Sequence, residues 1–395
     1  MLDPSIAVPS LLIVGLTAYG VAESRRHASN LARIPVRVHV NGTRGKSSVT
    51  RLIAAGLRSG RRRVFAKTTG TMARMIFPDG SEVEVFRVGR ANVIEQTRIV
   101  RRAVEERAEV LVIECMAVAP ELQPLTEERL VRSTLGVITN VRADHLDVMG
   151  PTVEDAARVL AQTLPRGGVA FTAERALSSI LEAEARRRGC ALTIADADSV
   201  RPDEIERFSY IEHAENVALA LAVCAQLGVP RAPALEAMIA APPDPGALRR
   251  HLVRVGSKEI TFVNAFAAND PDSTRLIWER LGLDRAEPGV RRIVLANCRA
   301  DRLQRSEQIA TLVASGLNAD HVVLSGEGTA AVAFRAVREG LDPSHLTDLG
   351  GRSAEQVFER VVALVERRGI VVGIGNIVGL GEEIVLHFEN RKFGP

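Results

Sequence analysis

The sequence predicts an α/β protein with a central nucleotide-binding domain on a mostly parallel sheet, a smaller C-terminal α/β domain and an apolar N-terminal helix. Three observations lead to this prediction. Short apolar runs that suit strands alternate with helical stretches along most of the chain. A glycine-rich loop follows the first of these runs. A proline-rich break at residues 241–250 precedes a second set of strand-like runs.

The bulk composition is that of a globular protein. With 395 residues, 46% hydrophobic and 25% charged, the chain has room for two or three domains. A net charge of +3 and an aromatic content of 4% argue against a nucleic-acid partner. Its 4 cysteines are widely spaced, which suits a reducing compartment and excludes a C-x-x-C zinc site.

The N-terminal segment is apolar. Residues 6–22 carry no charge and have the length of a short membrane span, and Arg25 and Arg26 follow them. Basic residues on this side place the following chain in the cytoplasm. The alternative is a helix packed on a partner or on its own domain. We therefore expect residues 1–32 to form a membrane-associated helix that holds the protein at the cytoplasmic face of the cell membrane.

Strand-like runs define the two domains that follow. Runs that are apolar throughout suit strands of a parallel sheet that is covered on both faces. We expect an ATP-binding central domain over residues 33–243 and a Rossmann-like α/β domain over residues 244–395. The predicted strands are residues 36–40, 63–67, 110–114, 135–139 and 168–172 in the first domain, and 259–263, 291–297, 321–326 and 370–375 in the second.

A phosphate-binding loop is predicted between the first strand and the first helix of the central domain. Its residues are Gly42, Thr43, Arg44, Gly45, Lys46 and Ser47. Backbone N–H groups at the start of a helix point at phosphates, a lysine reaches the terminal phosphates and a serine ligates Mg²⁺. The usual pattern G-x-x-x-x-G-K-[ST] asks for glycine where this chain has Val40. The alternative is an ordinary glycine turn.

Two further segments carry polar residues at the carboxyl ends of predicted strands, which face the ligand crevice of an open α/β sheet. Glu114 ends one strand. Another strand is followed by Asn140, Asp144, His145 and Asp147, a set that suits metal or phosphate binding. A solvated acid and a loop rich in turn-forming residues are the alternatives.

Together these motifs resemble the Mur ligase superfamily, whose shortened G-T-x-G-K-[ST] loop accounts for Val40. The stretches HVNGTRGKSSVTRLI, AKTTGTMARMIFPDG, DHLDVMGPT and NAFAANDPDS are similar to the PgsB/CapB-type ligase subunits of poly-γ-glutamate synthase. The resemblance implies a Mur-ligase-like fold and an ATP-dependent carboxylate–amine ligase that forms ADP through an acyl phosphate. Its substrates would be glutamate and the growing poly-γ-glutamate chain.

The resemblance also implies roles for individual residues. The cofactors would be ATP and Mg²⁺, with the loop from Gly42 to Ser47 on the triphosphate. Lys46, Glu114 and His145 would be catalytic. The metal would lie near Ser47, Glu114 and His145. Asn216 falls where the superfamily places a residue that contacts adenine; a polar residue on a helix surface is the alternative.

The implied partners are membrane subunits of a poly-γ-glutamate synthase complex, PgsC/CapC-like and PgsA/CapA-like, and homo-oligomerisation stays open. Arginines after a strand of the second domain are candidates to guide a polyanionic substrate; a solvated helix face is the alternative. They are Arg299, Arg302 and Arg305.

Some positions depart from the family pattern. Many Mur ligases carry a carbamylated lysine on the helix after the D-H-L-D segment, where this chain has Arg158 but no lysine. In the C-terminal segment Asn264 replaces an acid, which leaves Asn269 or Asp270 as a ligand. Two alternative functions remain: a γ-glutamyl ligase like folylpolyglutamate synthase, and a membrane-docked P-loop ATPase that drives a partner.

Overall fold

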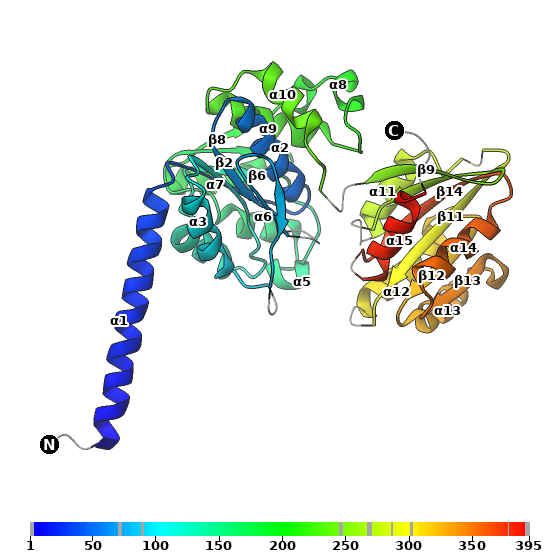
Figure 1. Ribbon diagram of the computed structural model, residues 1–395, viewed down its shortest axis with the longest axis horizontal. Coiled ribbons are helices and arrows are strands. Elements are labelled where there is room, and N and C mark those ends of the chain that lie inside the picture. The colour runs from blue at the N-terminus through cyan, green and yellow to red at the C-terminus, as the bar shows by residue number, and fades with distance from the viewer. Residues whose placement is uncertain are drawn as a thin grey trace. The chain divides into compact units, whose positions relative to one another are not determined.

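The chain divides into two compact units. They are residues 1–208 with 212–244, and residues 209–211 with 245–395. The computed structural model describes residues 4–69, 73–87, 91–244, 248–266, 271–285, 287–300, 303–377 and 379–391, without the side chains of residues 4–7, 9, 249, 272, 273 and 303–306. The first unit carries the glycine-rich loop, and Figure 1 shows its sheet with helices around it.

The first unit contains an eight-stranded sheet with the order β4-β3-β2-β5-β1-β6-β7-β8. From β2 to β8 every pairing is parallel, and β3 and β4 extend one edge as antiparallel strands. The strands are β1 (Val36–Asn41), β2 (Val64–Lys67), β3 (Arg74–Ile76), β4 (Glu82–Glu84), β5 (Val110–Glu114), β6 (Leu135–Ile138), β7 (Val169–Thr172) and β8 (Ala191–Ile194).

Helices cover this sheet and form its cores. The helix α2 packs against α9 and α10, while α3 packs with the C-terminal part of α1 over a core that includes Phe65, Leu111 and Ile113. The helices are α1 (Pro4–Ala32), α2 (Lys46–Ser59), α3 (Glu95–Glu105), α4 (Leu122–Leu125), η1 (Thr126–Val131), α5 (Leu146–Met149), α6 (Val153–Ala161), α7 (Ser178–Arg188), η2 (Ala197–Ser199), α8 (Pro202–Glu206), α9 (Ala214–Gln226) and α10 (Arg231–Ala240). At the start of α6, the Thr152 hydroxyl accepts a hydrogen bond from the Asp155 N–H and so caps the helix.

The second unit contains a six-stranded sheet with the order β13-β12-β11-β14-β10-β9, in which only β9 is antiparallel. Its strands are β9 (Arg249–Val255), β10 (Lys258–Asn264), β11 (Val290–Cys298), β12 (His321–Gly326), β13 (Leu346–Gly350) and β14 (Arg368–Gly375). Its helices are α11 (Pro271–Arg280), α12 (Leu303–Thr311), η3 (Leu312–Gly316), α13 (Thr329–Arg338), η4 (Pro343–His345), α14 (Ala354–Leu364) and α15 (Leu380–Glu389). The predicted α/β fold class, with two mostly parallel sheets and an N-terminal helix, is therefore confirmed.

Among the described residues, the N-terminal helix α1 is anchored at its C-terminal end. Leu31 and the following Ile34 are buried in the first unit, and His27 Nε2 lies 2.9 Å from the Leu130 carbonyl. Residues 10–26 are exposed, and they include the large apolar side chains of Leu11 and Leu16. Within the described part of the chain, no helix combines the length and the apolar character that a membrane span requires.

Candidate functional site

The loop between β1 and α2 has a backbone that only glycine fits at two positions. Gly42 has a φ of 130°, and a Cβ there would collide with the Thr139 hydroxyl. Gly45 has a φ of 79°, and its Cβ would lie 2.7 Å from Asn216 Oδ1. Both φ values lie where side chains are strained. At these two positions of the loop before α2, no side chain covers the backbone. This arrangement lets the N–H groups approach a phosphate.

Residues that follow β6 hold this loop in place. The Thr43 N–H donates to the Asn140 carbonyl at 3.0 Å, and the Thr43 hydroxyl donates to Asn140 Oδ1 at 2.8 Å. The Arg44 N–H donates to the same Oδ1 at 3.1 Å. In return the Arg142 N–H donates to the Thr43 hydroxyl at 2.8 Å. Because these bonds join neighbouring strand ends, the loop is fixed before any ligand arrives.

Lys46 begins α2 and folds its side chain back over the loop. Its Nζ donates to the Gly42 carbonyl at 2.7 Å and to the Thr43 carbonyl at 3.1 Å. The ammonium therefore lies beside the loop that is predicted to hold phosphates. An incoming anion would exchange these contacts with neutral carbonyls for contacts in which both partners are charged.

Glu114 lies at the end of β5, and Val40 of β1 is its register partner. Its side chain is buried, and its Oε2 accepts bonds from the Ser47 hydroxyl at 2.8 Å and from the Thr69 N–H at 2.7 Å. Two residues predicted to lie near the metal thus touch each other. A serine hydroxyl and a carboxylate are oxygen ligands of the kind that Mg²⁺ takes, so this pair fits the ion.

His145 caps α5 with a φ of 51°, an uncommon value for a residue with a side chain. Its ring is 45% exposed, and its Nε2 lies 3.8 Å from Asp144 Oδ1. Asp144 also lies 3.6 Å from Arg44. Within the described residues there is no group of three or more His, Cys, Asp or Glu side chains that could hold a metal ion. The metal role of His145 therefore stays a prediction.

One cavity of about 270 Å³ brings most of these residues together. It is lined by Asn41, Gly42, Thr43, Lys46, Thr69, Arg87, Ala91, Glu114, Cys115, Met116, Ala117, Val118, Asp144, His145 and Met149. Asn216 does not line it. The Asn216 side chain is buried behind Gly45, and its Nδ2 donates to Glu212 Oε1 at 2.7 Å. The adenine role of Asn216 likewise stays a prediction.

A buried charge network that was not predicted from the sequence lies behind this cavity. Lys67, which ends β2, is fully buried and lies 2.9 Å from Glu95 Oε1. Glu95 accepts bonds from Arg87 Nε at 2.6 Å and Nη2 at 3.1 Å. Burial lowers the pKa of Lys67 although Glu95 opposes this effect, and burial alone would raise the pKa of Glu95 but Arg87 and Lys67 lower it. The network fixes Arg87 in the cavity wall.

Other predicted residues lie elsewhere or outside the described chain. Arg158 is exposed on α6 and pairs with Asp155 at 2.8 Å, and Asn264 is buried at the end of β10. Arg299 follows β11. Asn269, Asp270 and Arg302 fall outside the described residues, as does the side chain of Arg305.

Family models match both units of the chain. The Mur ligase middle domain matches residues 40–222. The poly-gamma-glutamate synthase CapB C-terminal domain matches residues 250–391. The two matches thus cover the loop, the cavity and nearly all of the second unit.

Two curated relatives match over almost the whole chain. One is the capsule biosynthesis protein CapB of Bacillus anthracis, 37% identical over 391 residues, which are 98% of this chain and 84% of that protein. The other is the PGA synthase CapB of Bacillus subtilis (strain 168), 37% identical over 97% of this chain and 98% of that protein. The chain therefore belongs to the CapB family of poly-gamma-glutamate synthases, ATP-dependent ligases that carry the Mur ligase middle domain.

Solved structures share the fold. A Mycobacterium tuberculosis folylpolyglutamate synthase complexed with ADP has a TM-score of 0.67 at 19% identity, with 93% of each chain covered. A bifunctional folylpolyglutamate synthase/dihydrofolate synthase from Yersinia pestis, complexed with AMPPNP and a Mn ion, has a TM-score of 0.68 at 16% identity, again with 93% of each chain covered. At these identities the likeness establishes the fold alone.

Proposed function

We propose that this CapB-family ligase lengthens poly-γ-glutamate at the cavity between Lys46 and Glu114, using Mg²⁺ and ATP. The γ-carboxyl of the chain end attacks the terminal phosphate of ATP, which releases ADP and leaves an acyl phosphate. The amine of glutamate then attacks the acyl carbon, which releases phosphate and forms the amide. The observation that carries this proposal is the convergence of the glycine loop, Lys46 and the Ser47–Glu114 contact on one cavity wall.

Each loop residue has a defined task in this reaction. The backbone from Gly42 to Ser47 binds the triphosphate, with Thr43 and Arg44 held by Asn140. Lys46 moves from the loop carbonyls to the terminal phosphate and neutralises charge that builds up during transfer. Asn216, just behind Gly45, is proposed to contact the adenine.

The metal would be held by Ser47 and Glu114, with His145 completing its surroundings. Mg²⁺ supplies charge neutralisation on the phosphates. Apart from the metal, Glu114 also orients the Thr69 N–H and the Ser47 hydroxyl through its buried Oε2. Arg87, fixed by Glu95, presents a cation to the same cavity, where an anionic substrate is expected.

The exposed part of α1 supports a role in localisation. Its large apolar side chains include Leu11, Leu12, Ile13, Val14 and Leu16, which are all at least 60% exposed. We propose that they pack against membrane subunits of PgsC/CapC-like or PgsA/CapA-like type at the cytoplasmic face of the cell membrane. Such packing would keep a growing polyanion near its exit, because tethering raises the local concentration.

Glutamate-dependent nucleotide release tests the reaction. Purified protein is incubated with ATP, Mg²⁺, glutamate and a short poly-γ-glutamate primer, and the nucleotides and the polymer are analysed together. ADP, phosphate and a longer polymer, each dependent on glutamate, are expected. AMP with pyrophosphate would contradict an acyl phosphate, and ADP release without glutamate would indicate the alternative of an ATPase. Extension of a folate substrate instead of the primer would indicate the folylpolyglutamate alternative.

A further inference from the structure

A second recess lies at the far end of α2 from the loop. It measures about 680 Å³ and is lined by Arg58, Arg61, Arg62, Arg63, Phe77, Pro78, Asp79, Ser81, Val83, Arg102 and Glu106. The helix α2 has 14 residues, so its two ends are about 20 Å apart at 1.5 Å per residue. None of the residues that line the loop cavity lines this recess. We call it the arginine recess, after its five arginines.

The arginine recess carries unneutralised positive charge. Five arginines line it, against the two acids Asp79 and Glu106. Arg102 is paired with Glu106 at 2.7 Å. The other arginines form no ion pair with any acid of the described chain; Arg62 and Arg63 donate instead to backbone carbonyls, those of Leu227 and Glu106. Carbonyl contacts hold a guanidinium in position and leave its net charge in place.

Arg58 has a donor that lacks a partner. Its Nη1 is buried and makes no hydrogen bond within the described part of the protein. Asp79 and Glu82 attract Arg58 electrostatically, but neither pairs with it within 4.0 Å. A buried donor without an acceptor costs free energy. Other atoms of the Arg58 side chain line the recess. A cation in the last turn of α2 also favours the helix dipole, yet one residue suffices for that.

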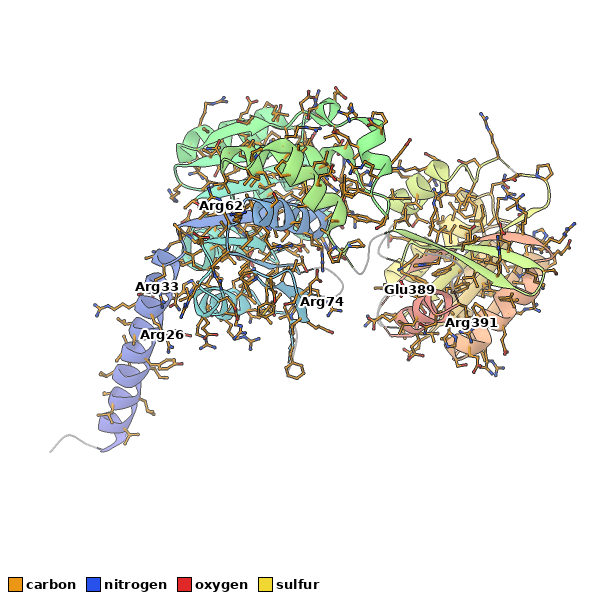
Figure 2. The ribbon with its side chains drawn as sticks, turned by 45° about the horizontal axis from the view of Figure 1, so that its top comes forward. Arg26, Arg33, Arg62, Arg74, Glu389 and Arg391 are labelled. Atoms are coloured by element: carbon orange, nitrogen blue, oxygen red, sulfur yellow. The ribbon has the colours of Figure 1, made fainter. Side chains whose placement is uncertain are left out.

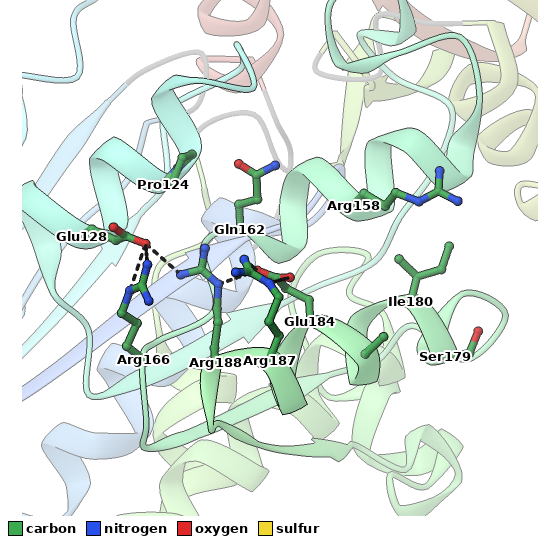
Figure 3. Close-up of a pocket in the computed structure, with 11 residues that line it drawn as sticks. Pro124, Glu128, Arg158, Gln162, Arg166, Ser179, Ile180, Glu184, Arg187 and Arg188 are labelled. Carbon is green, nitrogen blue, oxygen red and sulfur yellow. Dashed lines mark hydrogen bonds and ion pairs between the residues drawn. The ribbon is translucent and has the colours of Figure 1, made fainter.

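A second arginine-lined pocket of similar size differs from the arginine recess in how its arginines are paired. That pocket, of about 640 Å³, lies between α6, α7 and η1 (Figure 3). There Glu128 accepts from Arg166, and Glu184 accepts from both Arg187 and Arg188. The dashed lines of Figure 3 mark these pairs. Its guanidinium groups are thus occupied by fixed carboxylates, whereas most of those in the arginine recess are not.

The arginine recess also lies on a defined side of the sheet. Val64, Val110 and Val36 are register partners in three parallel strands, so Arg61–Arg63 come just before β2 at the edge where α1 leads into β1. Figure 2 labels Arg62 in the first unit, and Arg26 and Arg33 along α1 and just after it. The loop cavity lies at the opposite edge, where the strands end.

We infer that the arginine recess binds the polycarboxylate chain itself, as a second holding point for poly-γ-glutamate away from the reacting end. This inference rests on the proposed function, which supplies a chain with one carboxylate per unit. Planar guanidinium groups bind carboxylates through two parallel bonds, and several of them in series suit a repeating carboxylate. A chain held there stays on the enzyme between additions, on the side from which α1 extends.

Direct binding tests the inference without the reaction. Fluorescently end-labelled poly-γ-glutamate is titrated with the full chain at low ionic strength, without ATP, and anisotropy gives the Kd. The variant Arg58→Gln with Arg61→Asn is expected to weaken binding about five- to tenfold, because exposed charge pairs each change affinity by a few-fold. Arg61→Asn alone should weaken it less and leave the fold intact, because Arg61 is exposed with a φ of 59°, which asparagine tolerates.

The matched control removes two arginines from the other pocket. Arg166→Gln with Arg187→Gln deletes the same charge, and its Kd should stay within about twofold of the wild-type value, because both arginines are already paired. Equal weakening in the control, or no weakening in either recess variant, would overturn the inference. A further outcome would also overturn the inference. If vesicles containing phosphatidylglycerol displace the polymer, and if the same recess variants bind these vesicles more weakly, the recess binds lipid headgroups.

Glutamate-dependent ADP release, measured on the same protein preparations after ATP, Mg²⁺ and glutamate are added, separates this inference from the proposed function. With a primer too short to reach the recess, recess variants should release ADP at the wild-type initial rate, but they should make shorter polymer. A wild-type chain that binds polymer through the recess yet releases no ADP would refute the proposed reaction while supporting the recess. If ADP release is normal and the recess variants bind the polymer with the wild-type Kd, only the inference about the recess is refuted.

Discussion

Replacing Glu95 with glutamine is expected to lower the free energy of unfolding by about 3–5 kcal/mol, the usual cost of breaking one side of a buried ion pair. The Lys67 ammonium is fully buried, and Glu95 is the acid that pairs with it, at 2.9 Å. The Lys67 Nζ also lies 3.7 Å from the Met116 sulfur, which cannot replace a carboxylate. Urea unfolding, followed by circular dichroism, measures the change.

A matched surface variant and a double variant test the reason for this loss. Glu105→Gln breaks an exposed pair with Arg102 at 3.3 Å and should cost less than about 1 kcal/mol. Adding Lys67→Met to Glu95→Gln removes the unpaired charge and should restore more than half of the lost stability. A loss in Glu95→Gln no larger than in Glu105→Gln, or a double variant as unstable as Glu95→Gln, would refute the reasoning.

The pH dependence of the Glu95→Gln variant gives an independent check. Burial already lowers the pKa of Lys67, and Glu95 raises it, so the pKa falls further when Glu95 is neutral. In the unfolded chain the lysine pKa is about 10.4. Lys67 therefore keeps its proton in the unfolded chain over a pH range in which the folded variant has lost it. Stability of this variant should therefore rise with pH across that range, up to about pH 10.4.

Other predictions concern the site, a buried histidine and α1. Lys46→Ala should reduce glutamate-dependent ADP release roughly 100-fold or more with no loss of fold, and wild-type turnover would contradict its phosphate role. Glu114→Gln should raise the Mg²⁺ concentration for half-maximal activity about tenfold or more, and an unchanged Mg²⁺ dependence would remove it from the metal site. Burial alone would lower the pKa of His39, but Cys115 and Glu127 raise it to about 10. The stability that this protonated ring contributes is full below about pH 6.5 and is lost as pH rises to about 10, so urea unfolding of His39→Gln should show less loss over that range. A chain without residues 1–24 should still bind ATP but no longer co-purify with membranes from cells that make the polymer; unchanged co-purification would exclude α1 as the attachment.

The sequence predicts the central strands well because those strands are covered on both faces. β5 and β12 have the predicted bounds, and all their residues except the last one of β12 are buried. The strands that were not predicted lie at or next to sheet edges. β8, for example, is mostly exposed, and β4 alternates glutamates with one valine over three residues. Such short, mixed runs lack the continuous apolar pattern on which the prediction depends.

Among the site residues, those in one contiguous segment were predictable from the sequence, whereas contacts between distant segments were not. Gly42 to Ser47 were predicted because one contiguous loop carries the pattern, and the structure places that loop at the cavity. The Lys67–Glu95 pair was not predicted because its members are far apart in sequence and neither belongs to a recognisable spacing. Asn216 illustrates an intermediate case. The family resemblance implied that it contacts the adenine, and the structure places it behind Gly45, where it restricts that position to glycine.

The helix α2 connects the two anion-binding regions that the structure suggests, and its ends differ in a way that fits different ligands. At its N-terminus the backbone N–H groups and the helix dipole favour a compact, highly charged group such as a triphosphate. At its C-terminus the dipole repels anions, so any anion there depends on side chains, and Arg58 and Arg61–Arg63 supply them. Side-chain guanidiniums are spread over a recess of about 680 Å³, which suits a chain of separate carboxylates better than one phosphate cluster. Under our proposal, the site at the N-terminus of α2 activates the chain end, and the recess at its C-terminus keeps the rest of the chain from leaving.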